Sequence, residues 1–310
     1  MTATSASSAL SAPSAPTRRR ALTVTLATAA AVIAAPAAVA AASPAATAAR
    51  PPRPRPLRHA HAHNDYLHPR PLHDALAHGF TSVEADIFLV DGELLVAHDP
   101  AGLDPSRTLA GLYLEPLRAL ARAGLGSVHP HHRPPLQLLI DIKADGVAAY
   151  RELDRQLALA RYRPLFTRYD HGRVRPGAVT AVISGDRAAR APMEAQRTRL
   201  AFYDGRLDDL GTASPASFTP LISANWTQTF GWLGAGPFPH AERDRLRTLV
   251  STAHREGRRL RFWATPDLPG PEREAVWSEL LAAGADHLNT DDLAGLERFL
   301  RARAGAATTP

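Results

Sequence analysis

Short apolar runs alternate with amphipathic segments from residue 57 to about residue 301. Apolar runs of about four to eight residues between turn residues are typical of buried strands, and apolar positions three or four apart are typical of helices. The pattern predicts eight strands, at 57–63, 82–89, 136–142, 179–184, 200–204, 220–223, 260–264 and 287–289. It predicts the clearer helices at 71–78, 115–123, 147–161, 241–256, 271–283 and 292–301.

Strands that alternate with helices favour a parallel α/β fold. Eight such units over roughly 250 residues fit a (β/α)8 TIM barrel. The alternative is a doubly wound open sheet, which needs a glycine-rich phosphate turn after its first strand. No such turn follows residues 57–63, so we expect the barrel.

One turn changes the path of the second predicted strand. Asp91-Gly92 separates the apolar runs 87–90 and 93–97. An Asp-Gly pair between apolar runs is a strong signal for a β-hairpin. The hairpin would place His98 near the barrel mouth.

The chain before the barrel has the composition of a leader and a linker. Residues 1–48 combine a polar start, three consecutive arginines at 18–20, an apolar run and small-residue cleavage sites, which predicts a signal peptide and an exported protein. The arginines also resemble a twin-arginine signal, and the general secretory route and an Ala-rich disordered tail are the alternatives. Residues 49–56 are a Pro/Arg-rich linker, residues 57–303 the barrel domain, and residues 304–310 a predicted disordered tail.

Composition excludes several classes of function. The formal net charge is +6, but residues 1–50 hold four arginines and no acid, which leaves 32 basic against 30 acidic residues beyond them. That near-balance argues against nucleic acid as a partner, because such binding needs a basic face. The absence of cysteine excludes disulfides and a thiol nucleophile. Nothing in the composition indicates an obligate protein partner.

Two rare residue types mark specific positions. Of the 36 basic residues, 35 are arginine and the single lysine is Lys143. The chain has only three asparagines, at 64, 225 and 289. All four residues fall at or just after the carboxyl end of a predicted strand, which is where active sites of TIM barrels lie.

Three carboxylates stand in the apolar strands. Glu84 and Asp86 are two residues apart, so their side chains point to one face of a strand, and Asp141 occupies a similar place in 136–142. Carboxylates in one space repel each other unless a cation or a proton lies between them. A salt-bridged barrel interior is the alternative, but three oxygen ligands without a thiolate favour one hard divalent cation, Mg²⁺ or Ca²⁺.

Two histidines are candidates for acid–base chemistry near neutral pH. His63 lies furthest toward the carboxyl end of the first strand, and His98 ends the hairpin beside the carboxylates. Lys143 shares a face with Asp141, where it could pair with the carboxylates or hold a phosphate oxygen. Further polar or aromatic residues near the strand ends are candidates for substrate contact: Asn64, Asp65, Asp204, Asn225, Trp263, Asn289 and Asp291.

The order of the motifs resembles a known family. His63-Asn64-Asp65-Tyr66, Glu84-x-Asp86, Asp91-Gly92 before His98-Asp99, the run 139–143, the run 261–266 and Asn289-Thr290-Asp291 follow one another at similar spacing. The chain thereby resembles the glycerophosphodiester phosphodiesterase superfamily of phospholipase C-like enzymes. Within it, the chain is most similar to the branch that includes the fungal "altered inheritance of mitochondria" proteins.

The resemblance carries expectations about single residues. It implies a phospholipase C-like TIM barrel, catalytic roles for His63 and His98, and a divalent metal on Glu84, Asp86 and Asp141. It also places Lys143 and Trp263 at the family's basic and aromatic pocket positions. The His-Arg-Gly and Glu-Asn-Thr signatures of glycerophosphodiesterases are absent, and the third carboxylate is Asp, as in the related sphingomyelinase D enzymes.

The expected function is therefore a metal-dependent phosphoric diester hydrolase with a glycerophosphodiester or phospholipid-type substrate. Whether water or a neighbouring substrate hydroxyl attacks, and whether the protein contacts a membrane surface transiently, stay open. A metal-dependent amidohydrolase is one alternative, because His61-x-His63 and Asp291 fit its pattern. A non-catalytic binding protein on the same barrel is the other.

Overall fold

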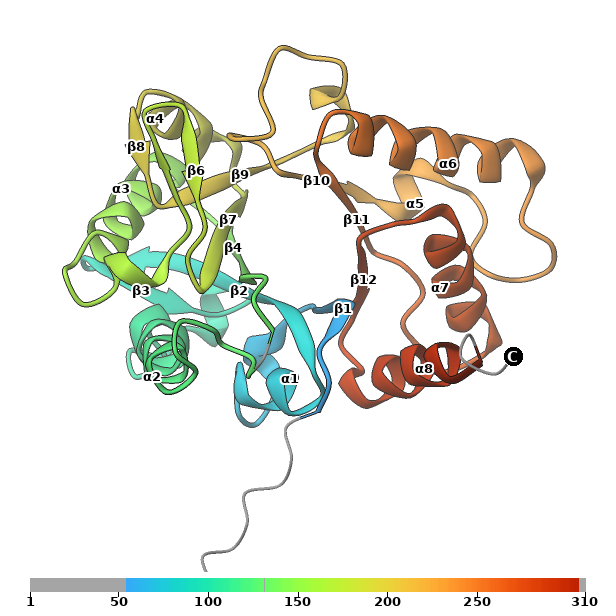
Figure 1. Cartoon of the computed structure of the whole chain (residues 1–310), viewed down its shortest axis with the longest axis horizontal. Coiled ribbons are helices and arrows are strands. Elements are labelled where there is room, and N and C mark those ends of the chain that lie inside the picture. Colours follow the sequence, from blue (N-terminus) through green and yellow to red (C-terminus); the bar gives the residue numbers. More distant parts are fainter. Residues whose placement is uncertain (1–53, 131, 307–310) are drawn as a thin grey trace, which may run out of the picture. The chain divides into compact units, whose positions relative to one another are not determined.

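A closed parallel barrel forms the centre of the computed structural model, which describes residues 54–130 and 132–306 (Figure 1). Each barrel strand is parallel to its neighbours, and the first strand pairs with both the second and the last, which closes the sheet. The strands are β1 (Leu57–Ala62), β2 (Phe80–Val90), β4 (Leu136–Ile142), β7 (Val179–Gly185), β9 (Ala201–Gly205), β10 (Leu221–Asn225), β11 (Arg259–Trp263) and β12 (His287–Thr290). The predicted TIM barrel is confirmed.

Helices lie around the outside of the barrel (Figure 1). They are α1 (His73–Ala77), α2 (Glu115–Ala123), α3 (Gly146–Leu157), α4 (Arg190–Glu194), α5 (Trp226–Thr229), α6 (His240–Arg255), α7 (Pro271–Ala283) and α8 (Leu293–Ala306). No helix of the described chain has the length and apolar character needed to cross a membrane.

Some boundaries differ from the prediction. Helix α3 ends at Leu157 instead of residue 161, and a 3-10 turn at Arg163–Leu165 follows, in which Pro164 cannot continue an α-helix. Helix α8 continues to Ala306, past the expected domain end at 303. The predicted signal peptide, most of the linker and residues 307–310 lie outside the described residues.

The predicted hairpin is confirmed. Strand β3 (Glu93–Val96) runs antiparallel to the end of β2. Asp91 and Gly92 have φ values of 49° and 84°, the left-handed pair that a tight hairpin turn requires. The backbone N–H of Ala97 donates to the Asp86 carbonyl at 3.2 Å, so the hairpin brings His98 back beside β2.

A small second sheet was not predicted. Strands β5 (Arg168–Asp170), β6 (Arg173–Arg175) and β8 (Thr198–Arg199) pair antiparallel. Their two or three residues are mostly polar, so no apolar alternation marks them in the sequence. The Arg199 guanidinium lies over the Tyr169 ring at 4.1 Å, which ties β8 to β5.

The barrel interior has an apolar wall and a polar wall. Four side chains from β4, β7, β9 and β10 form a buried cluster: Leu139, Val182, Phe202 and Leu221. Across from them, strands β1, β2, β11 and β12 carry buried polar groups: His61, Ser82, Glu84, Arg261 and His287. Through Glu84, the polar wall adjoins the carboxylate cluster described next.

Candidate active site

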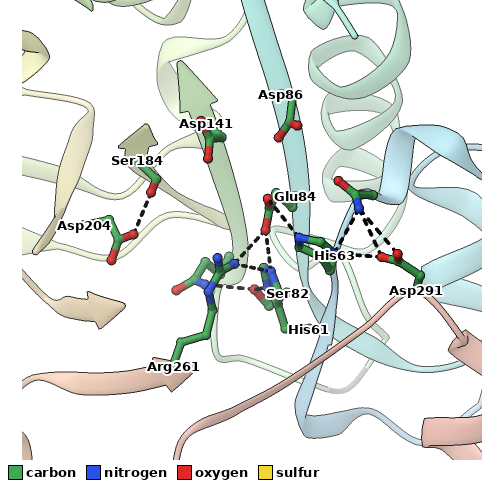
Figure 2. A network of polar contacts seen from close by, with 12 residues as sticks. His61, His63, Ser82, Glu84, Asp86, Asp141, Ser184, Asp204, Arg261 and Asp291 are labelled. Carbon is green, nitrogen blue, oxygen red and sulfur yellow. Dashed lines mark hydrogen bonds and ion pairs between the residues drawn. The ribbon is translucent and has the colours of Figure 1, made fainter. Parts of the chain in front are cut away.

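Glu84, Asp86 and Asp141 converge at the carboxyl end of β2 and β4 (Figure 2). Asp86 and Asp141 are direct partners in the parallel β2–β4 register, and Glu84 lies two residues before Asp86 on the same face. One oxygen from each carboxylate lies within 4.8 Å of the others. The alternation of residues along β2 and the register with β4 are therefore enough to assemble the cluster.

Two buried side chains hold the Glu84 carboxylate, and Arg261 carries the charge that balances it. Arg261 Nη1 donates to Glu84 Oε2 at 2.6 Å, and His61 Nε2 lies 2.9 Å from the same oxygen. Burial disfavours the ionised carboxylate, but Arg261 and His61 outweigh it and hold the pKa of Glu84 well below its usual range. Burial, together with Arg261, lowers the pKa of His61 to about 4, so this imidazole is neutral at pH 7. The other oxygen, Oε1, faces His63.

Asp86 is bound through one oxygen only. Lys143 Nζ lies 2.7 Å from Oδ2, and the Tyr66 hydroxyl donates to Oδ2 at 2.5 Å. The second oxygen, Oδ1, is buried and has no hydrogen-bond partner among the described residues. Burial and the charge of Glu84 raise the pKa of Asp86, against the attraction of Lys143.

Asp141 is the least compensated of the three carboxylates. Its Oδ1 lies 3.7 Å from Lys143 Nζ, which places the single lysine beside Asp141, as expected. Burial, followed by the charges of Asp86 and Glu84, raises the pKa of Asp141 to about 7 despite Lys143. Among the described residues, the ionised form of this carboxylate pairs with Lys143 alone, which it shares with Asp86.

These residues fit a divalent cation. Asp86 Oδ1 is a buried acceptor without a donor, Glu84 Oε1 is free of the Arg261 contact, and the Asp141 carboxylate is only weakly paired. Carboxylate oxygens in this number suit Mg²⁺ or Ca²⁺. A cation held by the three groups would remove the repulsion that raises the pKa values of Asp86 and Asp141.

His63 reaches the cluster from the end of β1. Its Nδ1 lies 2.8 Å from Asp291 Oδ1, and its Nε2 lies 4.0 Å from Glu84 Oε1. Asn64 adopts the left-handed conformation, with φ 47°, and its Nδ2 donates to Asp291 at 3.3 Å. Burial lowers the pKa of His63, but the bond to Asp291 and the charge of Glu84 outweigh it, so that pKa is raised.

His98 lies at the same mouth but apart from the carboxylates. Its side chain is 61% exposed, and its Nδ1 lies 3.9 Å from Asp99 Oδ2. It lines a pocket of about 480 Å³ together with Tyr66, whose hydroxyl contacts Asp86. The structure thus places both histidines at the mouth, and no interaction of the described residues joins their rings.

The predicted substrate residues divide into accessible and buried ones. Asp291 is exposed and Trp263 is half-buried, and Asn225 caps α5 by accepting the Gln228 N–H at 3.2 Å. Asp204 is fully buried, and its Oδ2 accepts a hydrogen bond from Ser184 at 2.7 Å (Figure 2). Arg206 donates to the same oxygen at 3.0 Å. Asn289 is also buried, and its Oδ1 has no partner.

Asp65 is a correction to the prediction of substrate contact. Its side chain is fully buried, and its Oδ2 accepts hydrogen bonds from the Leu72 N–H at 2.6 Å and the Tyr113 hydroxyl at 2.8 Å. Burial raises its pKa to about 7. Asp65 holds the loop that carries Asn64 and Tyr66, and its carboxylate does not face the mouth.

The sequence prediction missed four residues of the site. His61 and Tyr66 had a signal, because His61 shares a strand face with His63 and Tyr66 follows the His-Asn-Asp motif. Arg261 had none, since it is one of 35 arginines. Gly185 could be found only in three dimensions: a Cβ there would lie 2.2 Å from Asp141 Oδ1.

The chain is similar in sequence to known proteins. A family profile described as "AIM6-like phosphodiesterase domain" matches residues 55–204, and one described as "Glycerophosphoryl diester phosphodiesterase family" matches residues 259–294. Altered inheritance of mitochondria protein 6 of Eremothecium gossypii is 32% identical over 280 residues, covering 78% of this chain and 69% of the relative. Its homolog from Arthroderma benhamiae is 29% identical over 255 residues, covering 75% and 81%.

A solved structure is also similar. The chain is 15% identical to the crystal structure of a protein described as a "Putative glycerophosphoryl diester phosphodiesterase" from Agrobacterium tumefaciens, with a TM-score of 0.36. The match covers 72% of this chain and 86% of that one.

Gly185→Ala should weaken cation binding at the carboxylates. The new methyl group would press on Asp141 Oδ1 and on the Ile142 carbonyl, both at 2.2 Å, and so displace one of the three oxygens. We expect the dissociation constant for Mg²⁺ or Ca²⁺, measured by calorimetry, to rise at least tenfold.

Gly211→Ala is the matched control. Gly211 has a similar φ of 75° but no atom within 4 Å of a new Cβ. Both variants bear the left-handed strain of about 1–2 kcal/mol in stability, but only Gly185→Ala crowds a carboxylate. Equal cation affinities in the two folded variants would show that Gly185 has no part in the site.

Proposed function

The chain belongs to the AIM6-like phosphodiesterase family, and from this membership and the geometry of the barrel mouth we propose that it is a metal-dependent phosphoric diester hydrolase. Its substrate is a glycerophosphodiester or a phospholipid-type diester. The observation that carries the proposal is the cluster of Glu84, Asp86 and Asp141, whose oxygens lie within 4.8 Å beside His63.

The three carboxylates would hold one divalent cation, Mg²⁺ or Ca²⁺. When bound, the cation supplies Lewis-acid neutralisation of the non-bridging phosphate oxygens. Lys143 adds a second positive charge at the same place, because Asp141 and Asp86 outweigh burial and raise its pKa. Its ammonium stays bound to Asp86 and fixes that carboxylate's Oδ2, so Oδ1 is the oxygen left to face the cation.

His63 is positioned to move a proton at Nε2. Its Nδ1–H donates to Asp291, which fixes the ring and leaves Nε2 directed toward Glu84 and the carboxylate cluster. Asp291 also stabilises the protonated His63 ring, in keeping with the raised pKa of His63. His63 can therefore take a proton from an attacking oxygen or give one to a leaving oxygen at the same atom.

His98 provides the complementary group. In the proposed reaction a bond forms between phosphorus and the attacking oxygen, and the bond from phosphorus to one ester oxygen breaks. One histidine takes the proton of the attacker while the other gives a proton to the departing alcohol. The attacker is water or a neighbouring hydroxyl of the substrate.

The amidohydrolase alternative fits the barrel less well. That class places metal-binding histidines at the ends of the fifth and sixth barrel strands, which here are β9 and β10. Those ends carry Asp204 and, on β10, Ser223 and Asn225. His61 is also occupied, because its ring lies between Ser82 and the Arg261–Glu84 pair.

Export remains part of the proposal, on the basis of the leader at residues 1–48. A soluble or membrane-associated phosphodiester outside the cytoplasm would then be the substrate. A non-catalytic protein on this barrel would bind such a molecule without turning it over.

Activity should require a divalent cation. Excess chelator is expected to abolish hydrolysis of glycerophosphodiesters by the purified protein, with Mg²⁺ or Ca²⁺ restoring it. Because the pKa of Asp141 is raised to about 7, this carboxyl is protonated below that pH and must ionise to bind the cation. Cation affinity, measured by calorimetry, should therefore increase as the pH rises from 6 to 8; full activity after exhaustive chelation would contradict the metal assignment.

Removing either histidine should damage turnover. His63→Ala and His98→Ala are each expected to lower kcat roughly 10²–10⁴-fold, the usual size of an acid or base contribution. His59→Ala is the control and should change kcat little, because His59 lies within β1, toward the end of the strand opposite to His63. A His98→Ala protein with wild-type kcat would remove His98 from the mechanism.

Lys143→Arg should lower kcat in a protein that stays folded. The compact ammonium lies 2.7 Å from Asp86 and 3.7 Å from Asp141, and a planar guanidinium would crowd the space shared with a cation and a phosphate. A purely electrostatic role predicts near wild-type turnover, since the charge is kept. Measuring kcat and Tm on the same variant distinguishes loss of the pocket role from loss of folding, and an unchanged kcat would refute the pocket role.

A further inference from the structure

A pocket of about 480 Å³ adjoins the carboxylate cluster. One side is formed by residues 66–69, in the loop after β1. The other is formed by residues 96–99, Gly102 and Arg107, which belong to the end of β3 and the loop after it. Its volume lies within the range of about 300–1,000 Å³ that small-molecule sites occupy.

The pocket shares a wall with each half of the proposed machinery. Tyr66 lines it and donates its hydroxyl to Asp86 at 2.5 Å, so the cluster lies directly behind this ring. His98 lines it as well, with a side chain that is 61% exposed. The ester oxygen that exchanges a proton with His98 would therefore carry its alcohol into this pocket.

The described lining of the pocket combines one guanidinium with imidazoles and one carboxylate. Arg107 is half-buried, and its Nη2 donates to the Tyr66 carbonyl, which fixes the guanidinium against the pocket wall. Two imidazoles, His68 and His98, lie near it. Asp99 is the carboxylate of the lining; it accepts the Gly102 N–H at 3.1 Å and its side chain is 61% exposed, so solvent screens its charge.

We infer that this pocket is the subsite for the alcohol on the His98 side of the phosphate, and that Arg107 selects alcohols bearing a second anionic group. The inference rests on the proposed function and deepens it. A guanidinium binds a carboxylate or a phosphate through two parallel hydrogen bonds, which an alcohol without an anionic group cannot accept in the same way.

Two soluble diesters test the selection. Glycerophosphoserine and glycerophosphoethanolamine differ by one carboxylate and share the ammonium group, so any effect of Asp99 on the ammonium is common to both. We expect the wild-type protein to have the higher kcat/KM for glycerophosphoserine. Arg107→Met should reduce the ratio of the two kcat/KM values at least tenfold, and Arg107→Lys should retain part of it.

Arg70→Met is the matched control. Arg70 lies on the loop after β1, its side chain is 70% exposed, and it pairs with Asp74 outside the pocket lining. This variant removes one positive charge and should keep the wild-type ratio. Arg107 also donates to the Tyr66 carbonyl. If Arg107→Met lowered kcat/KM equally for both substrates, Arg107 would have a structural role only, and the inference would be overturned.

Direct binding separates this inference from the proposed function. By calorimetry with Mg²⁺ or Ca²⁺ present, O-phosphoserine should bind the wild-type protein more tightly than O-phosphoethanolamine, and Arg107→Met should remove the difference. Selective binding without hydrolysis of either diester would contradict the hydrolase proposal and support the subsite. Hydrolysis of both diesters with equal kcat/KM and equal binding would leave the hydrolase standing and overturn the subsite.

Discussion

Repulsion among three carboxylates is the constraint on which the barrel mouth depends. Two unit charges 4.8 Å apart repel by about 3 kcal/mol at an effective dielectric constant of 20. Glu84 and Asp86 are nearly or fully buried, so water cannot screen them. A basic side chain pairs with each of these two carboxylates: Arg261 with Glu84, and Lys143 with Asp86. The third charge, on Asp141, has to share Lys143 with Asp86 at the longer distance of 3.7 Å, and a divalent cation would balance this remaining negative charge.

The same constraint explains why the barrel interior has two different walls. Arg261 can enter the interior only where polar groups accept it, and it meets Glu84 and the neutral His61 there. His61 is in turn 2.7 Å from the Ser82 hydroxyl, which accepts a hydrogen bond from Gln137 at 2.8 Å. These hydrogen bonds connect Gln137 and Ser82, inside the barrel, through His61 to Glu84 of the carboxylate cluster. The opposite wall, formed by β4, β7, β9 and β10, holds the apolar cluster of Leu139, Val182, Phe202 and Leu221, and Leu139 lies beside Glu84 in the β2–β4 register.

The parts of the site that follow from strand periodicity were predictable from the sequence. Alternation places Glu84 and Asp86 on one face, and the rarity of lysine marks Lys143. All eight barrel strands and the hairpin follow from apolar runs and one Asp-Gly turn. Partners far along the chain were not predictable: Arg261 is 177 residues from Glu84 and has no compositional mark. Asp65 was misassigned because a polar residue after a strand looks the same in sequence whether it faces the mouth or, as here, a buried tyrosine. The short strands of the second sheet lack the apolar alternation that periodicity needs.

Closure of the barrel and completion of the acid–base group are one event. His63 follows the first strand, and Asp291 follows the last, 228 residues later. The backbone N–H of His63 donates to the Thr290 carbonyl at 3.0 Å, so β1 and β12 must be paired before Asp291 can fix the imidazole. Contacts between such distant residues carry a large loop-closure cost and are slow to form. The carboxylates of β2 and β4, in contrast, come from strands that are neighbours among the barrel strands along the chain. The three carboxylates thus come from the first half of the barrel, whereas the groups that hold Glu84 and His63, Arg261 and Asp291, come from its last two strands and the residue after them.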